Sequence, residues 1–121
     1  MEIFREFSFE AAHQLPAVHP HHKCGRLHGH SYRATVTIRG DVDPTKGWVT
    51  DFAEISVAFD PIRQQLDHHY LNEINGLENP TSENVARWIY DRLAESLPLA
   101  AVAVRETDHS GAIYRGPTDE R

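Results

Sequence analysis

Hydrophobic and polar residues alternate along residues 2 to 13 and again along residues 28 to 39. Alternation with a period of two is typical of a β-strand that buries only one face. We therefore predict two strands with one apolar face each. The apolar positions are Ile3, Phe7, Phe9 and Ala11 in the first stretch, and Tyr32, Ala34, Val36 and Ile38 in the second.

Two later stretches carry apolar residues at helical spacing. The first begins after Asp51, a capping residue type, and contains Pro61. Because proline removes a backbone donor, we expect a kink or a break near residues 57 to 60. The second follows the turn at residues 79 to 83 and stops at Pro98. The apolar faces consist of Phe52, Ile55, Phe59, Ile62 and Leu66, and of Val85, Trp88, Ile89, Leu93 and Leu97.

Two short β-type runs, at residues 99 to 106 and 112 to 115, complete the order strand, strand, helix, helix, strand, strand. This ββααββ order predicts an α+β fold, a four-stranded antiparallel sheet with both helices on one face. A length of 121 residues suits a single domain spanning residues 1–121. The second sheet face is polar and both edges are open. Closing several sheets into a ring of subunits would cover them.

The apolar faces of the first two strands also carry histidines, His13 on one and His28 with His30 on the other. Antiparallel pairing would bring the end of the first strand opposite the start of the second. Neutral imidazole is the commonest protein ligand of Zn²⁺, and three histidines leave one coordination position open for water or substrate. The sequence therefore predicts a catalytic Zn²⁺ site, although three imidazoles also suit other divalent ions.

The chain's only cysteine, Cys24, lies four residues before His28 on a glycine-containing loop. A single cysteine excludes an intrachain disulfide. Lys23 and Arg26 flank it, and positive neighbours stabilise a thiolate that can act as a base near neutral pH. The alternative is that Cys24 is the fourth metal ligand; the spacing favours the base.

Charge limits the class of partner. The formal net charge is −6, which argues against general nucleic-acid binding, since that requires a basic face. Lys23, Arg26 and the histidines at 19, 21 and 22 nevertheless form a local basic patch. This patch either binds an anionic ligand or is a solvated loop.

Two further carboxylates are candidates for chemistry. Asp67 precedes His68 at the end of the first predicted helix, and a carboxylate beside an imidazole can shuttle protons or orient the ring. Capping of the helix C-terminus explains the same pair. Glu106 ends a strand on its apolar side, where it could bind adjacent N–H groups such as those of guanine or pterin, or else turn into solvent.

No run of apolar residues approaches the length of a membrane span, and the N-terminus lacks the apolar core of a signal peptide. We therefore expect a cytoplasmic protein without a membrane partner.

Four segments together resemble the 6-pyruvoyl-tetrahydropterin synthase family, and within it the bacterial 6-carboxy-tetrahydropterin synthases of queuosine biosynthesis. The resemblance extends from Phe7 to Gly116. Its most specific segments are residues 24–30, 47–52, 66–72 and 77–83, which read CGRLHGH, GWVTDF, LDHHYLN and LENPTSE.

The resemblance implies the tunnelling fold, in which the sheets of three subunits close into a barrel and two trimers stack as a hexamer with active sites between subunits. It implies a lyase that converts 7,8-dihydroneopterin triphosphate to 6-carboxy-5,6,7,8-tetrahydropterin, acetaldehyde and triphosphate. The implied roles are zinc ligands for His13, His28 and His30, the base for Cys24, a proton relay for His68 with Asp67, and the pterin anchor for Glu106. Lys23 and Arg26 would offer a counter-charge to the triphosphate.

Two alternatives remain open. The pyruvoyl branch of the same family eliminates triphosphate from the same substrate but keeps the three-carbon side chain. A non-enzymatic metal buffer would instead use the loop from His19 to His22 and would bind more than one Zn²⁺ per subunit. His109, in the last hairpin turn next to Glu106, is a departure from the expected pattern, and its role is left open.

Overall fold

The computed structural model describes residues 1–19 and 21–120. The first two strands, β1 (Glu2–His13) and β2 (His28–Arg39), lie where the alternation predicts them. The helices are α1 (Phe52–Leu66) and α2 (Ser82–Leu93). The remaining strands are β3 (His69–Tyr70), β4 (Leu99–Arg105) and β5 (Gly111–Tyr114), and single 3₁₀ turns span Lys23–Gly25, Leu71–Glu73 and Pro117–Glu120.

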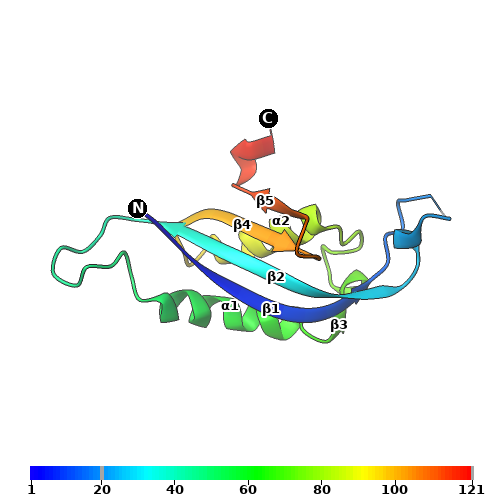
Figure 1. Cartoon of the computed structure of the whole chain (residues 1–121), viewed down its shortest axis with the longest axis horizontal. Coiled ribbons are helices and arrows are strands. Elements are labelled where there is room, and N and C mark those ends of the chain that lie inside the picture. The colour runs from blue at the N-terminus through cyan, green and yellow to red at the C-terminus, as the bar shows by residue number, and fades with distance from the viewer. Residues whose placement is uncertain (20, 121) are drawn as a thin grey trace.

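The strands form one sheet in the order β3-β1-β2-β4-β5. β1 and β2 are antiparallel over their whole lengths, and His13 is the partner of His28. Both helices pack on the same face, α1 along β1 and α2 behind β4 and β5 (Figure 1). The predicted α+β architecture is therefore confirmed.

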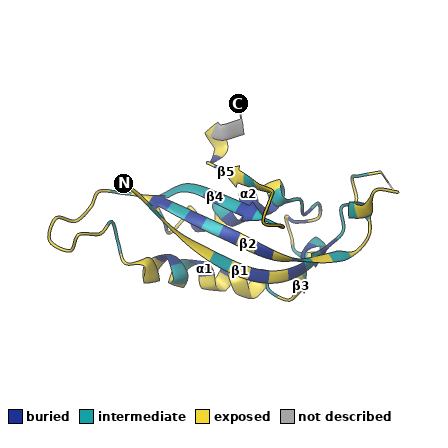
Figure 2. Cartoon of the chain, viewed as in Figure 1, coloured by how far each residue is buried: buried dark blue, intermediate teal, exposed yellow. Residues whose placement is uncertain are grey.

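The core fills the space between this sheet face and the helices. Buried and exposed residues alternate along β1 and β2, as Figure 2 shows. Burial of these apolar side chains is the main favourable term in folding. The largest buried apolar side chains are Tyr32, Phe9, Phe59, Ile38, Ile55, Leu66, Leu71, Leu77, Ile89 and Leu93.

The sheet differs from the predicted four-stranded antiparallel one because β3 adds a fifth, parallel strand. β3 pairs with β1 only at Ala11 and Ala12. Two residues are too few to show a period-two pattern, so no local pattern predicts this strand. Tertiary contacts hold it, since the side chain of Asp67 accepts the N–H of Glu10 and the N–H of His68 donates to the carbonyl of Glu10.

The expected break at Pro61 does not occur, because α1 is continuous from Phe52 to Leu66. Proline removes the hydrogen bond to the carbonyl of Val57, four residues earlier. Val57 is 74% exposed, so water can satisfy that carbonyl while the buried side of α1 continues past the proline. The hydrogen bond that is lost at Pro61 therefore lies on the solvent-exposed side of the helix.

The second helix ends earlier than expected, at Leu93 rather than near Leu97. The N–H groups of Ser96 and Leu97 both donate to the carbonyl of Leu93, which closes the helix with a turn. The residue before a proline is restricted to extended backbone, so the chain needs this turn before Pro98 and the start of β4. Leu97 still packs against the core from the turn.

The second sheet face is polar, as predicted. Ion pairs join Glu2 to Arg39 and Glu6 to Arg105, and the hydroxyl of Ser31 donates to Glu10. Such exposed pairs add little stability and leave this face accessible.

Helix α1 starts at a side-chain cap, in which the Oδ1 of Asp51 accepts the N–H of Ala53 at 2.9 Å. We expect Asp51→Ala to lower the free energy of unfolding by about 1 kcal/mol. Asp51→Asn should retain most of the stability, because asparagine also caps. Urea unfolding at a fixed protein concentration measures both. An equal loss in the two variants would contradict capping as the cause.

Candidate metal centre and active site

The three predicted histidine ligands meet at one end of the β1–β2 hairpin. One ligand nitrogen from each of His13, His28 and His30 lies within 4.8 Å of the others. The ring centroids of His13 and His28 are 4.5 Å apart, and those of His28 and His30 are 4.8 Å apart. The strand register produces this convergence, because it sets His13 opposite His28 and Ala11 opposite His30.

Backbone carbonyls orient two of these rings. The Nδ1 of His28 lies 2.6 Å from the carbonyl of Arg26, and the Nδ1 of His13 lies 2.8 Å from the carbonyl of Pro80. A nitrogen that faces a carbonyl carries the proton, so the lone pair lies on Nε2 of each ring. Metal-binding histidines commonly have such partners, which fix the tautomer and the ring orientation.

The residues fit a divalent ion. The Nε2 atoms of His13 and His28 are 2.9 Å apart, and two lone pairs at this distance need a cation or proton between them. The Nε2 of His30 is buried and has no hydrogen-bond partner. A single ion bound by three imidazole nitrogens would satisfy all three groups and would keep one tetrahedral position free.

Burial sets the electrostatics of this centre. It holds the pKa of His13 and the pKa of His30 below their usual range, which favours the neutral rings that bind metal. Tyr32 lies beneath His13, fully buried, with its hydroxyl 2.9 Å from the Nδ1 of His13. Burial also raises the pKa of Tyr32, so its hydroxyl stays protonated.

Glu106 lies beside the centre rather than turning into solvent. Its Oε2 is 3.6 Å from the Nε2 of His30, and its side chain is 24% exposed. An adjacent cavity of about 390 Å³ on the polar sheet face is lined by Glu106 together with Ser31, Arg33, Arg105, Thr107, Asp108 and His109. The carboxylate therefore stands between the histidine cluster and an open space.

Cys24 lies in the 3₁₀ turn Lys23–Gly25 and is half-buried. Its N–H donates to the Nδ1 of His22, and its carbonyl accepts the N–H of Leu15. Among the described residues, the cluster of potential ligands consists of the three histidines without Cys24. This arrangement favours the base over the fourth ligand, and the role stays a prediction.

Asp67 and His68 form a pair at the outer edge of β1. The Oδ2 of Asp67 lies 3.1 Å from the Nδ1 of His68, whose side chain is 78% exposed. The N–H of Glu10, helped by His68, lowers the pKa of Asp67, so the carboxylate is ionised. Asp67 also caps α1 through its backbone, and His68 has a left-handed φ of 60°. The helix cap is thus made by the backbone of Asp67, and the roles of the two side chains stay predictions.

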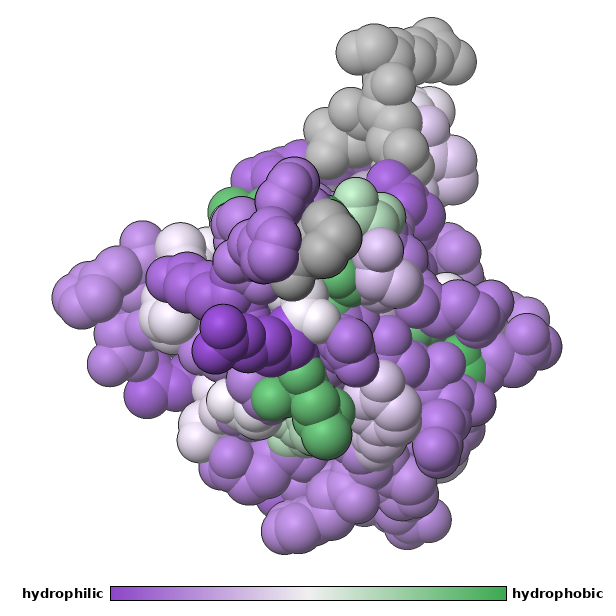
Figure 3. Space-filling view, turned by 90° about the vertical axis from the view of Figure 1, so that its right-hand side faces the viewer, coloured by the Kyte–Doolittle hydropathy of each residue, from purple (hydrophilic) through white to green (hydrophobic). Residues whose placement is uncertain are grey.

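The β1–β2 loop projects from the end of the molecule that carries the histidines, and most of this face is hydrophilic (Figure 3). Lys23 and Arg26 are exposed on it. His19 and His21 have rings 5.2 Å apart, but the described residues hold no second group that could bind a metal. His109 is exposed in the β4–β5 turn, where the neighbouring Asp108 pairs with Arg33.

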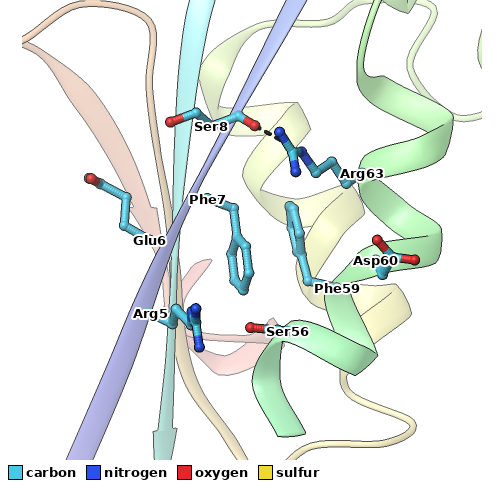
Figure 4. A pocket seen from close by; sticks show the side chains of 8 residues that line it. All are labelled: Arg5, Glu6, Phe7, Ser8, Ser56, Phe59, Asp60 and Arg63. Carbon is cyan, nitrogen blue, oxygen red and sulfur yellow. Dashed lines mark hydrogen bonds between the residues drawn. The ribbon is translucent and has the colours of Figure 1, made fainter. Parts of the chain in front are cut away.

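A separate cavity of about 370 Å³ lies between β1 and α1 (Figure 4). The rings of Phe7 and Phe59 stack there at 4.2 Å, and the Nε of Arg63 donates to the carbonyl of Ser8. None of the predicted site residues lines it. Arg63 thus occupies part of the outer edge of β1.

Sequence reasoning missed four residues that support the site: Tyr32, Pro80, Gln14 and Asn72. The spacing His28, His30, Tyr32 on one strand face was a usable signal for Tyr32. The carbonyl of Pro80 is 67 residues away from His13 in the sequence, and no local pattern indicates such a contact. Gln14 and Asn72 bind each other across 58 residues.

The fold and the site define an α+β domain with a three-histidine centre able to hold a metal ion. In the described part of the chain, no helix is both long and apolar enough to cross a membrane. A sequence model of the family described as 6-pyruvoyl tetrahydropterin synthase matches residues 2–117. The chain belongs to this family.

Relatives differ in their named activities. A 6-carboxy-5,6,7,8-tetrahydropterin synthase from Synechocystis is 48% identical, with 95% of this chain and 93% of the relative covered. A dihydroneopterin monophosphate aldolase from Pyrococcus furiosus is 37% identical, with 79% and 77% covered. The structure of the Caenorhabditis elegans 6-pyruvoyl tetrahydropterin synthase superposes with a TM-score of 0.87 at 30% identity, covering 96% and 95% of the two chains.

We expect one divalent ion per chain, and His28→Ala should reduce it to a negligible level because two imidazoles bind weakly. Cys24→Ala should retain the ion, and His21→Ala on the same loop is the matched control. The metal content of all three variants is measured by atomic emission after gel filtration. If Cys24→Ala also loses the metal, the cysteine is a ligand and not a base.

Proposed function

We propose that this protein is a Zn²⁺-dependent lyase that converts 7,8-dihydroneopterin triphosphate to 6-carboxy-5,6,7,8-tetrahydropterin, acetaldehyde and triphosphate. The observation that carries the proposal is the three-histidine cluster with a carboxylate, Glu106, directly beside it. The 48% identity to a 6-carboxy-5,6,7,8-tetrahydropterin synthase favours this reaction within the family. We place the protein in the cytoplasm, and its reaction at an early step of the biosynthesis of queuosine and other 7-deazapurines.

Glu106 binds the pterin ring in this proposal. A carboxylate accepts two parallel hydrogen bonds, which match the adjacent N–H groups of an amino-pyrimidinone ring. Its position, 3.6 Å from His30, would place the side chain of the pterin toward the histidines. Bound Zn²⁺ would supply Lewis acidity to the side-chain hydroxyls at that point.

Cys24 and His68 move the protons. Cys24 takes a proton from the side-chain carbons of the substrate, for which its half-buried place on the loop beside the histidines is suitable. Asp67 holds the imidazole of His68 in place through their 3.1 Å contact. Lys23 and Arg26, exposed on the same loop as Cys24, offer counter-charges to the triphosphate.

His68 acts on the site of a neighbouring subunit in a homo-hexamer of two trimers. Asp67 and His68 are attached to β1 at Glu10, three residues and about 10 Å before His13. The ring of His68 is exposed at the outer edge of the sheet, away from its own chain. β3, Asp67, His68 and Arg63 occupy this edge only from Ser8 to Ala12, so the N-terminal half of β1 is left for a strand of another copy.

The direct test is incubation of the zinc-loaded protein with 7,8-dihydroneopterin triphosphate. We expect mass spectrometry to detect 6-carboxy-5,6,7,8-tetrahydropterin together with acetaldehyde. Formation of 6-pyruvoyl-tetrahydropterin without acetaldehyde would contradict the proposal and support the pyruvoyl branch. Dihydroneopterin monophosphate is the control substrate, and faster turnover of it would identify an aldolase.

A mixing experiment tests the shared site. Cys24→Ala and His68→Asn should each be inactive alone; asparagine is chosen because it tolerates the left-handed backbone of His68. Equal mixtures of the two variants, refolded together, should recover about one quarter of wild-type activity. In that share of sites, one subunit supplies an intact Cys24 and its neighbour supplies an intact His68. No recovery in mixed oligomers of confirmed composition would place both residues in one chain's site.

A further inference from the structure

The loop that carries Cys24 is tied to the metal centre at its base. The side-chain Nε2 of Gln14 donates to the carbonyl of Gly25 at 2.7 Å, and the N–H of Leu15 donates to the carbonyl of Cys24 at 2.9 Å. Gln14 directly follows His13, and Gly25 directly follows Cys24. One side-chain hydrogen bond therefore joins the neighbour of a histidine in the cluster to the neighbour of the thiol.

Gln14 is itself held by a second side chain. The Oδ1 of Asn72 accepts the N–H of Gln14 at 2.9 Å, and the Nδ2 of Asn72 donates to the carbonyl of Gln14 at 2.6 Å. The amide thus pairs with both backbone groups of one residue, as a neighbouring strand would. Asn72 follows β3, so it extends the contact of that segment with β1 beyond Ala12.

These contacts divide the long β1–β2 connection into two parts. Most hairpin loops have two to five residues, and a connection as long as residues 14 to 27 is ordinarily mobile. Here the bonds from Gln14 and Leu15 close the loop at its base, and the histidines between these bonds, at 19, 21 and 22, are exposed. Cys24 lies in this closed base, where its own carbonyl is bound by Leu15 and the following carbonyl is bound by Gln14.

We propose that Gln14 and Asn72 are positioning residues for Cys24. Asn72 fixes the backbone of Gln14, and the Gln14 side chain holds the carbonyl of Gly25, the residue directly after Cys24, at a set distance from the histidines. This inference rests on the proposed role of Cys24 as the base. Proton transfer depends steeply on distance, and a displacement of about 1 Å can cost roughly 100-fold in rate.

Gln14→Glu tests the proposal because it preserves the size of the side chain but replaces the donor to Gly25 with an acceptor. We expect kcat to fall at least about tenfold while KM changes less than about threefold. The metal content should stay at the wild-type level. Gln65→Glu on the exposed side of α1 introduces the same charge and is the matched control.

The single cysteine supplies a readout that does not depend on turnover. Release of the loop base should expose the half-buried thiol, so Cys24 in Gln14→Glu should react with iodoacetamide at least about threefold faster than in Gln65→Glu. Hydrogen exchange of the Leu15 amide should accelerate in the same variant, while the amides of β1 remain protected. Asn72→Asp, which retains only the acceptor to Gln14, should shift all three measurements in the same direction.

Two outcomes would overturn the proposal. One is a Gln14→Glu enzyme whose kcat and alkylation rate match those of Gln65→Glu. The other is loss of activity in proportion to loss of metal, which would mean that Gln14 acts through His13. If Gln14→Glu does not fold, Gln14→Met removes the donor without adding charge and decides by the same criteria. If the wild-type protein does not convert the substrate, the proposed function fails, and the alkylation and exchange rates still decide the positioning role.

Discussion

The register between β1 and β2 is the constraint on which the rest of the structure depends. It sets His13 opposite His28 over an unbroken antiparallel ladder, and the alternation of the strands turns both rings and His30 to the buried side. A slip of one residue would send every side chain of one strand to the other face. The same slip would remove Phe9 and Ala11 from the core, so the apolar residues that stabilise the sheet also specify the geometry of the three-histidine cluster.

The centre is consequently built on the core side of the sheet, where polar groups need partners. Neutral imidazoles tolerate that environment better than charged ligands, and burial lowers the pKa of His13 in the required direction. Tyr32 and the carbonyl of Pro80 satisfy the Nδ1 of His13, and its Nε2 faces the Nε2 of His28 in the cluster that could hold an ion. The two groups proposed to move protons lie on segments outside the core, the half-buried Cys24 on the loop and the exposed His68 at the edge of the sheet.

The sequence predicted the parts of the fold that local patterns encode. Alternation gave both long strands and the convergence of the histidines, and the cap at Asp51 gave the start of α1. No local pattern predicts β3, because this strand is held by the bonds of Asp67 and His68 to Glu10, more than 50 residues away in the sequence. The continuity of α1 past Pro61 was also missed, since it depends on which side of the helix faces water, a tertiary property.

The same distinction applies to the site and explains why its supporting residues were harder to find than its reactive ones. Ligands and bases are restricted to a few residue types, so His13 or Cys24 can be proposed from composition and spacing alone. Support can come from any backbone carbonyl or side-chain amide that the fold brings near, as Pro80, Gln14 and Asn72 show. β1 connects these parts of the site. Its last residue is His13, and its outer edge binds the segment that carries His68. Gln14, the residue after β1, binds Asn72 and the loop that carries Cys24. β1 thus links its own His13 to two segments that are distant in the sequence, through contacts made by residues outside the histidine cluster.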